Sequence, residues 1–188
     1  YGFETAGFSS YITGDAYYLG ATGSYAHNIE SVNITGGSGD DQLYGTDRDD
    51  SLTGANGNDL LDGLTGVSSL NGGLGDDTVS LDISATALDI VFNAITAATS
   101  SGTILADGSR IRNAEHIGTL STGSGNDQLT VTLAQGGFTW NAGGGAERLT
   151  TDYSADTAGF SGYVSGDAYY LSATAAYANF VESVGVTG

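Results

Sequence analysis

The stretch from Gly36 to Ser80 decides the fold, and it reads GGSGDDQLY (36–44), GTDRDDSLT (45–53), GANGNDLLD (54–62), GLTGVSSLN (63–71) and GGLGDDTVS (72–80). Each of these five blocks has nine residues, begins with Gly and carries an aliphatic residue at its eighth position. Four of the five also have Asp at the sixth position. This nine-residue period does not match the 3.6-residue period of a helix. It predicts a short strand after each tight turn, repeated until the strands stack.

Composition limits the functions that this chain can have. Its 188 residues include 31 Gly, 22 acidic side chains, four Arg and no Lys, Cys, Pro or Met, for a formal net charge of -18. Such a charge repels nucleic acid and anionic membranes, so we expect no nucleic-acid partner and no membrane insertion. The lack of Cys excludes disulfides, and the 39% hydrophobic content argues against a disordered chain.

An internal duplication surrounds the nonapeptide blocks. Residues 5–36 and 157–188 match without a gap at 21 of 32 positions, at a spacing of 152 residues. A more distant copy begins near Asp82. Gly188 stands where Gly36 opens the first set of blocks, so we expect the chain to be part of a longer tandem array.

The chain therefore alternates spacers with repeat arrays. We expect a first spacer at 1–35, a nonapeptide array at 36–80, a diverged spacer at 81–121, a short degenerate array at 122–150, and a last spacer, copied from the first, at 151–188. Alternating Val, Ile, Thr and Tyr with Gly punctuation favours strands throughout. The Ala-rich stretches 94–100 and 172–178 are short and lack clear capping, so no helix is predicted there.

The acidic turns have the composition of a calcium site. Calcium takes six to eight oxygen ligands from carboxylates and backbone carbonyls, and Gly lets a turn direct carbonyls inward because it accepts positive φ. Three of the blocks, GGSGDDQLY, GANGNDLLD and GGLGDDTVS, resemble the nonapeptide GGxGxDxUx of the RTX (haemolysin-type) calcium-binding repeats. The spacers resemble segments between such arrays in long bacterial surface proteins.

This resemblance implies an all-β fold, a parallel β-roll or β-solenoid with calcium-binding turns and with the Tyr-rich spacers as further rungs. Two nonamers make one coil, so the turns fall in two rows. The first edge holds turns 36–41, 54–59 and 72–77, and the second edge holds turns 45–50 and 63–68. On the first edge we expect one Ca²⁺ ion between Asp41 and Asp59 and another between Asp59 and Asp77.

The second edge is expected to bind calcium weakly. Ser68 stands where the motif has Asp, and Arg48 replaces Gly. In the short array, Asp127 and Glu147 are candidates for one further site. For the position-five residues, a ligand role and simple turn formation remain equal alternatives. The predicted metal-site residues are Asp41, Asp59, Asp77, Asp50, Asp40, Asn58, Asp76, Gly37, Gly39, Gly57, Gly73, Gly75 and Asp127.

Other acidic residues recur at matching places in the three spacers. We interpret the aspartates as turn formers and the glutamates as acceptors for backbone amides. They are Asp15, Asp107, Asp167, Glu30, Glu115 and Glu182. The sequence contains no GxSxG, P-loop or HExxH motif, and Asn179 replaces His27 in the duplicate. We therefore expect a protein without enzymatic activity.

Together with the resemblance, these features imply a calcium-dependent structural module of a secreted or cell-surface bacterial repeat protein, in a surface layer, an extracellular fibre or an adhesin. The expected partners are neighbouring repeats or copies of the same chain. Two alternatives stay open. One is an adhesive module whose Tyr-rich spacers hold a cell-surface glycan or a partner protein. The other is an accessory β-roll of a secreted enzyme.

Overall fold

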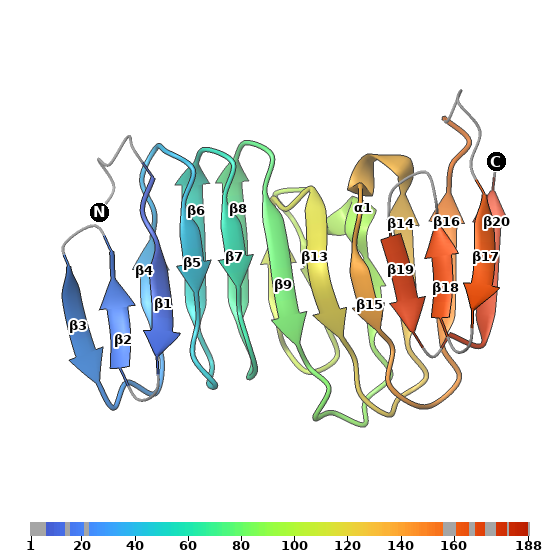
Figure 1. Cartoon of the computed structure of the whole chain (residues 1–188), viewed down its shortest axis with the longest axis horizontal. Coiled ribbons are helices and arrows are strands. Elements are labelled where there is room, and N and C mark those ends of the chain that lie inside the picture. The colour runs from blue at the N-terminus through green and yellow to red at the C-terminus, as the bar shows by residue number, and fades with distance from the viewer. Residues whose placement is uncertain are drawn as a thin grey trace.

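The structure is a computed structural model that describes residues 7–13, 16–20, 23–155, 161–165, 168–171, 176–179 and 181–187. Strands dominate these residues, with one short α-helix among them, so the prediction of an all-β chain is confirmed (Figure 1). In this part of the chain, no helix is long and apolar enough to cross a membrane.

The nonapeptide array forms two parallel sheets between which the chain alternates. One sheet contains β5 (Gln42–Tyr44), β7 (Leu60–Asp62) and β9 (Thr78–Asp82), and the other contains β4 (Asn33–Thr35), β6 (Ser51–Asn56) and β8 (Ser69–Leu74). Neighbouring strands pair at a spacing of 18 residues, so that Leu43 lies beside Leu61 and Leu61 beside Val79. Two nonamers thus make one passage through both sheets, as the block length predicts.

The aliphatic residues at position eight form the core of the array. Leu43, Leu52, Leu61 and Leu70 are 0% exposed, because alternate side chains of each strand point between the sheets. Burial of one such side chain contributes about 1.5–3 kcal/mol. Each coil contributes only two of them, so a single coil is too small to be stable and depends on stacking against its neighbours.

The same alternation continues after the array. β13 (His116–Ser121) and β15 (Thr139–Asn141) extend the sheet of β9, while β10 (Val91–Asn93), β14 (Gln128–Thr132), β16 (Arg148–Asp152) and β20 (Ser183–Thr187) form another parallel sheet. β12 (Arg110–Arg112) pairs with β8 and carries β11 (Thr103–Ile104) on its outer side. The 3-10 turn η1 (Leu133–Gln135) joins β14 to β15.

The helix α1 (Ala94–Ala97) corrects the prediction of strands throughout. The side chain of Asn93 caps it by accepting a hydrogen bond from the backbone N–H of Ile95, and Ala94 and Ala97 are buried. The cap is therefore present in the sequence, as Asn93 directly before the Ala-rich stretch. In the second Ala-rich stretch, the described residues Ala176–Asn179 form the strand β19.

The Tyr-rich spacers differ from the prediction of further parallel rungs. β1 (Ser10–Thr13), β2 (Ala16–Leu19) and β3 (Ser24–His27) pair antiparallel, and β17 (Gly162–Ser165), β18 (Ala168–Leu171) and β19 repeat this arrangement. Two residues separate β1 from β2, enough for a hairpin but too few for a parallel crossover. The last strand of each spacer, β4 or β20, joins a parallel stack, and in the last spacer β19 also pairs in parallel with β15.

Candidate metal centre

The position-six carboxylates form a hydrogen-bonded ladder along the first edge. Asp41, Asp59 and Asp77 are at most 2% exposed. Asp59 Oδ1 accepts the backbone N–H of Asp41 at 2.8 Å, and Asp77 Oδ1 accepts that of Asp59 at 2.8 Å. The ladder continues at both ends, since Phe8 N–H donates to Asp41 Oδ1 at 2.7 Å and Asp77 N–H donates to Glu115 Oε2 at 2.9 Å. The structure therefore brings the three predicted aspartates into one row.

The second oxygen of each carboxylate distinguishes these aspartates. Asp59 Oδ2 and Asp77 Oδ2 are buried without a hydrogen-bond partner, whereas Asp41 Oδ2 accepts the N–H of Gly37 at 2.7 Å. A buried carboxylate oxygen without a donor is costly unless a positive charge compensates it. Asp59 and Asp77 therefore fit a bound cation better than Asp41 does.

The position-one glycines leave room beside these two oxygens. A Cβ on Gly54 would collide with Asp59 Oδ2 and the carbonyl oxygen of Gly72. A Cβ on Gly72 would collide with Asp77 Oδ2 and the carbonyl oxygen of Asn113. Each of these places is thus bordered by one carboxylate and one carbonyl oxygen, which are the ligand types that calcium takes.

The predicted glycines do not all have the same conformation. Gly57, Gly73 and Gly75 have φ values of +116°, +122° and +145°, in the region that favours glycine. Gly37 and Gly39 are not in that region. The first turn of the array therefore differs from the third, in agreement with the extra hydrogen bond from Gly37 to Asp41.

Within the described ranges, no three His, Asp or Glu side chains gather into a metal-binding cluster. An ion on the first edge would therefore take most of its ligands from backbone carbonyls, with one or two carboxylates. Calcium accepts such a mixed oxygen set, whereas structural zinc sites use Cys and His side chains. The donor atoms present thus favour calcium.

The position-five residues form a second ladder that runs in the opposite direction. Asp40 Oδ1 accepts the N–H of Asn58 at 2.8 Å, and Asn58 Oδ1 accepts the N–H of Asp76 at 3.0 Å. All three side chains are exposed. Of the two alternatives for these residues, the geometry favours a structural role in the turn, because Asp40 and Asn58 accept backbone amides of the next coil.

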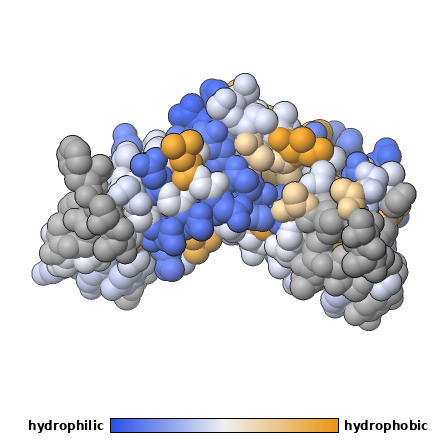
Figure 2. Space-filling model, turned by 90° about the horizontal axis from the view of Figure 1, so that it is seen from above, coloured by the Kyte–Doolittle hydropathy of each residue, from blue (hydrophilic) through white to orange (hydrophobic). Residues whose placement is uncertain are grey.

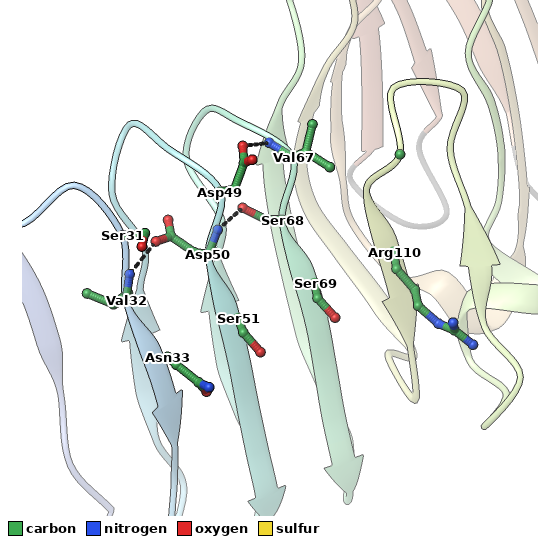
Figure 3. Close-up of a pocket in the computed structure, with 11 residues that line it drawn as sticks. Ser31, Val32, Asn33, Asp49, Asp50, Ser51, Val67, Ser68, Ser69 and Arg110 are labelled. Atoms are coloured by element: carbon green, nitrogen blue, oxygen red, sulfur yellow. Dashed lines mark hydrogen bonds between the residues drawn. The ribbon is translucent and has the colours of Figure 1, made fainter.

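The second edge keeps its ladder through serine hydroxyls (Figure 3). Val32 N–H donates to Asp50 Oδ1 at 2.8 Å, and Asp50 N–H donates to Ser68 Oγ at 3.3 Å, beside a shallow cavity of about 490 Å³. The N–H and the hydroxyl of Thr46 donate to Asp50 as well. Asp50 therefore has protein donors on both oxygens and Ser68 brings no charge, so this edge offers less to a cation.

The short array brings Asp127 and Glu147 together. Its turns stack directly, since Gly144 N–H donates to the carbonyl of Gly123 at 2.9 Å and Arg148 N–H donates to that of Asp127 at 2.8 Å. Asp127 is 0% and Glu147 1% exposed. Asp127 Oδ2 and both carboxylate oxygens of Glu147 have no hydrogen-bond partner. This pair thus has the same buried acceptors without donors as the first edge.

Three of the recurring spacer acids, Asp107, Glu115 and Glu182, act as the sequence predicts, whereas Glu30 is exposed and its backbone carbonyl accepts the hydroxyl of Thr46. Asp107 accepts hydrogen bonds from the backbone and the hydroxyl of Ser109, which makes it a turn former. Besides Glu115, Glu182 accepts a backbone amide, that of Glu147, at 2.6 Å. Asp15 and Asp167 lie outside the described residues.

One contact of the first edge was not expected from the sequence. The His116 ring lies 2.6 Å from Asp76 Oδ1 through Nε2 and 2.7 Å from the carbonyl of Gln135 through Nδ1. It links the last turn of the array to η1. Only the position of His116, one residue after the recurring Glu115, hints at this role in the sequence.

Burial changes the acidity of three carboxyl groups. Burial, together with the charges of neighbouring carboxylates, raises the pKa of Asp59 and of Asp77 to about 6. Burial likewise raises the pKa of Glu147 to about 7, with the carboxylates of Glu182 and Asp127 adding to it. Without a cation, ionisation of these groups at neutral pH therefore opposes folding.

We expect opposite pH dependences with and without calcium. The folded-state pKa of Asp59 and Asp77 exceeds the unfolded value of about 4, so the folded state binds more protons than the unfolded state between about pH 4 and 6. Stability in calcium-free buffer should therefore rise as the pH falls from 7.5 to 5. Calcium needs the ionised carboxylates, so the calcium-loaded protein should lose stability over the same range.

Circular dichroism at both pH values, with and without calcium, checks this expectation. Asp49→Asn is the matched control, because Asp49 is exposed and its Oδ1 accepts the N–H of Val67 in a bond that Asn preserves. The stability of this variant should still change with pH in opposite directions with and without calcium. If stability changed with pH in the same direction with and without calcium, the assignment of Asp59 and Asp77 to calcium binding would be contradicted.

Comparison with known families gives one match. Residues 35–70 and 54–83 match the family model described as RTX calcium-binding nonapeptide repeat (4 copies). The two matches together span 35–83, which includes the ladder from Asp41 to Asp77. No curated protein matches the chain. RTX nonapeptide repeats bind calcium, so calcium is the cofactor of this segment.

Proposed function

Residues 35–83 belong to the RTX calcium-binding nonapeptide repeats, and from this premise we propose that the chain is a calcium-dependent structural module of a secreted or cell-surface bacterial repeat protein. RTX repeats typically occur in secreted proteins, which supports an extracellular location. The observation that carries the proposal is the pair of buried oxygens without donors, Asp59 Oδ2 and Asp77 Oδ2. We also propose that the alternating parallel sheets form a β-roll.

Calcium and folding are coupled in this proposal. The folded chain stacks buried carboxylates 18 residues apart and has a formal net charge of -18. The face shown in Figure 2 is mostly hydrophilic over its middle, with small apolar patches. When bound, calcium supplies the positive charge that offsets the buried carboxylates. Its binding free energy then becomes folding free energy, because the sites do not exist in the unfolded chain.

The role proposed is structural. The 152-residue duplication favours a tandem repeat protein of a surface layer, an extracellular fibre or an adhesin over an accessory β-roll of a secreted enzyme. We further propose that the chain has no enzymatic activity and that its partners are neighbouring repeats or copies.

Trypsin provides a direct test of calcium-dependent folding. The four arginines are the only trypsin sites, and three of them, Arg110, Arg112 and Arg148, lie in strands. Cleavage in a strand requires local opening, so its rate follows the population of the open state. We expect cleavage at these sites to be at least roughly tenfold slower in calcium than in chelator, with fragments identified by mass spectrometry.

Magnesium is the control for this experiment. It demands near-octahedral geometry and loses its water reluctantly, so millimolar magnesium should not protect the three sites. Equal cleavage rates in calcium and in chelator would rule out the proposed coupling.

An adhesive function is the second candidate, and the first spacer favours it. The rings of Tyr11 and Tyr18 stack with centroids 5.1 Å apart, and Tyr18 and Tyr25 lie 5.9 Å apart. Tyr25 is 63% exposed. Tyr11 is also exposed and Tyr18 is half-buried, so this row of rings is a partly exposed surface on which a sugar could stack. Binding to a glycan array that Tyr25→Ala abolishes would support this candidate.

A further inference from the structure

The two spacers have similar sequences, identical at 21 of 32 positions, but different neighbours. β1–β4 lie at one end of the molecule and β17–β20 at the other (Figure 1). Equivalent residues are 152 apart, so β3 corresponds to β19 and β4 to β20. β19 pairs in parallel with β15, with Ala178 beside Trp140, and β20 pairs with β16. Their counterparts β3 and β4 are instead the outermost strands of their sheets within the described residues.

On the other side of the spacers, the first copy is covered and the last copy is not. The first spacer contacts the nonapeptide array, since Gln42 N–H donates to the carbonyl of Phe8 at 2.8 Å and the hydroxyl of Tyr17 donates to the carbonyl of Tyr44 at 2.5 Å. The corresponding strands of the last spacer, β17 and β20, are outermost in their sheets. Each copy of the spacer is therefore covered on one side only, and the covered sides differ.

Side-chain exposure agrees with this relation. Ala178 is 0% exposed against β15, whereas its equivalent Ala26 is exposed. Tyr17 is 6% exposed beside the array, whereas its equivalent Tyr169 is only half-buried. The spacer thus has two edges that can pair with strands. One edge fits the last coil of a repeat array, and the other fits the first coil of the next array.

The carboxylate ladder shows the same complementarity. Glu182 Oε2 accepts the N–H of Glu147, which continues the ladder from the short array into the last spacer. The equivalent residue in the first spacer, Glu30, is exposed. On the other side of the first spacer, Val32 N–H already donates to Asp50 at the start of the array. Glu30 is thus placed to accept the amide that Glu182 accepts.

We propose that the outer edge formed by β3 and β4 is a docking surface for the coil end formed by β15 and β16 of a second copy of this chain. The internal duplicate identifies this occupant, because a closely similar spacer already pairs with β15 and β16 at the other end of the molecule. One sheet then runs β15–β3–β2–β1–β5 across the junction, and the other runs β16–β4–β6. A strand at the edge of a sheet can be extended by a further strand through main-chain hydrogen bonds.

The last spacer competes with this docking in the intact chain. β19 and β20 already cover β15 and β16, and they are tethered to them, which gives a high effective concentration. A second copy that displaces them exchanges equivalent contacts and gains none. We therefore expect the isolated intact chain to be mainly monomeric in solution, with docking favoured when the last spacer is weakened. The inference rests on the self-association proposed above and names the surface that performs it.

Ala178→Arg in the full chain tests the proposal. The new side chain cannot fit beside Trp140 at a fully buried position, so β19 leaves β15 and exposes that edge to β3 of another molecule. In saturating calcium, light scattering after size exclusion should show a change from the 18.9 kDa monomer to species of at least twice that mass. Trp140 is the only tryptophan, so its emission should shift to the red on dilution and return at high concentration.

Ala26→Arg is the matched variant, because Ala26 is the exposed equivalent of Ala178. By itself it should leave the protein monomeric with Trp140 buried. The double variant A26R/A178R should remain monomeric at every concentration. A folded A178R protein that stays monomeric, or a double variant that associates as strongly as A178R, would overturn the proposal.

If A178R unfolds and loses its sheet signal in circular dichroism, a milder pair of substitutions tests the same proposal. Asn179 is half-buried and donates from Nδ2 to Asn141 Oδ1 at 3.1 Å. Asn179→Arg with its matched variant His27→Arg should show the same pattern of association and rescue, and its absence would equally overturn the proposal. Failure of calcium-dependent folding is distinguishable, because it would remove the sheet signal from the unmodified chain as well.

Discussion

Millimolar calcium added to the chelated protein is expected to convert its circular dichroism spectrum from coil to sheet. An ion that binds only the folded state at one hundred times its dissociation constant stabilises that state by about 2.7 kcal/mol. Two ions on the first edge would contribute about 5 kcal/mol, which is comparable to the whole stability of a small domain. The thin core of each coil leaves little stability without them.

Sodium chloride at equal ionic strength is the control for simple screening of the net charge. If calcium acted only by screening the charge of -18, sodium chloride at equal ionic strength would restore the sheet as well. We expect that it does not, because the oxygens of Asp59 and Asp77 are buried and require a bound ion. A chelated sample with unchanged sheet content would refute the calcium-dependent folding.

The second large effect is expected from Asp59→Ala, which should lose two calcium ions. Asp59 lies in the middle of the first edge, between Asp41 and Asp77, and both predicted sites share its carboxylate. By the estimate above, loss of both ions costs about 5 kcal/mol at one hundred times the dissociation constant. Isothermal titration calorimetry gives the number of ions directly.

Ser68→Ala is the matched control for this variant. Ser68 occupies the same position of the motif on the second edge, and its Oγ accepts the N–H of Asp50 as Asp59 Oδ1 accepts that of Asp41. Both variants therefore lose one ladder hydrogen bond, worth about 1 kcal/mol, and only Asp59→Ala also loses a charge. Equal losses of bound calcium in the two variants would contradict the difference between the edges.

Much of the array could be predicted from its nine-residue period. Position eight of every block points into the core, and the 18-residue spacing brings Asp41, Asp59 and Asp77 into one row. These relations repeat from coil to coil, so the sequence displays each of them several times. A repeated local pattern is a strong signal because the same interactions must form at every step.

Which carboxylate oxygens have a hydrogen-bond donor could not be predicted from the nine-residue period. The motif treats Asp41, Asp50 and Asp59 alike, but Gly37 supplies a donor to Asp41 and Thr46 supplies donors to Asp50, whereas Asp59 Oδ2 has none. These differences arise from the residue at position two and from the backbone conformation of each turn. Both vary between blocks that share the same glycine and aspartate positions.

The sequence by itself determined the all-β class, the strand period, the core positions and the row of first-edge aspartates. The tertiary structure decided how the spacers pair, which side of each is covered, and which carboxylate oxygens have no donor. The physical reason is the range of the interactions. The nonamers contact copies of themselves 18 residues away, so their pattern is visible locally. The equivalent strands β3 and β19 differ in burial because of what lies beside them, and their own residues do not specify it.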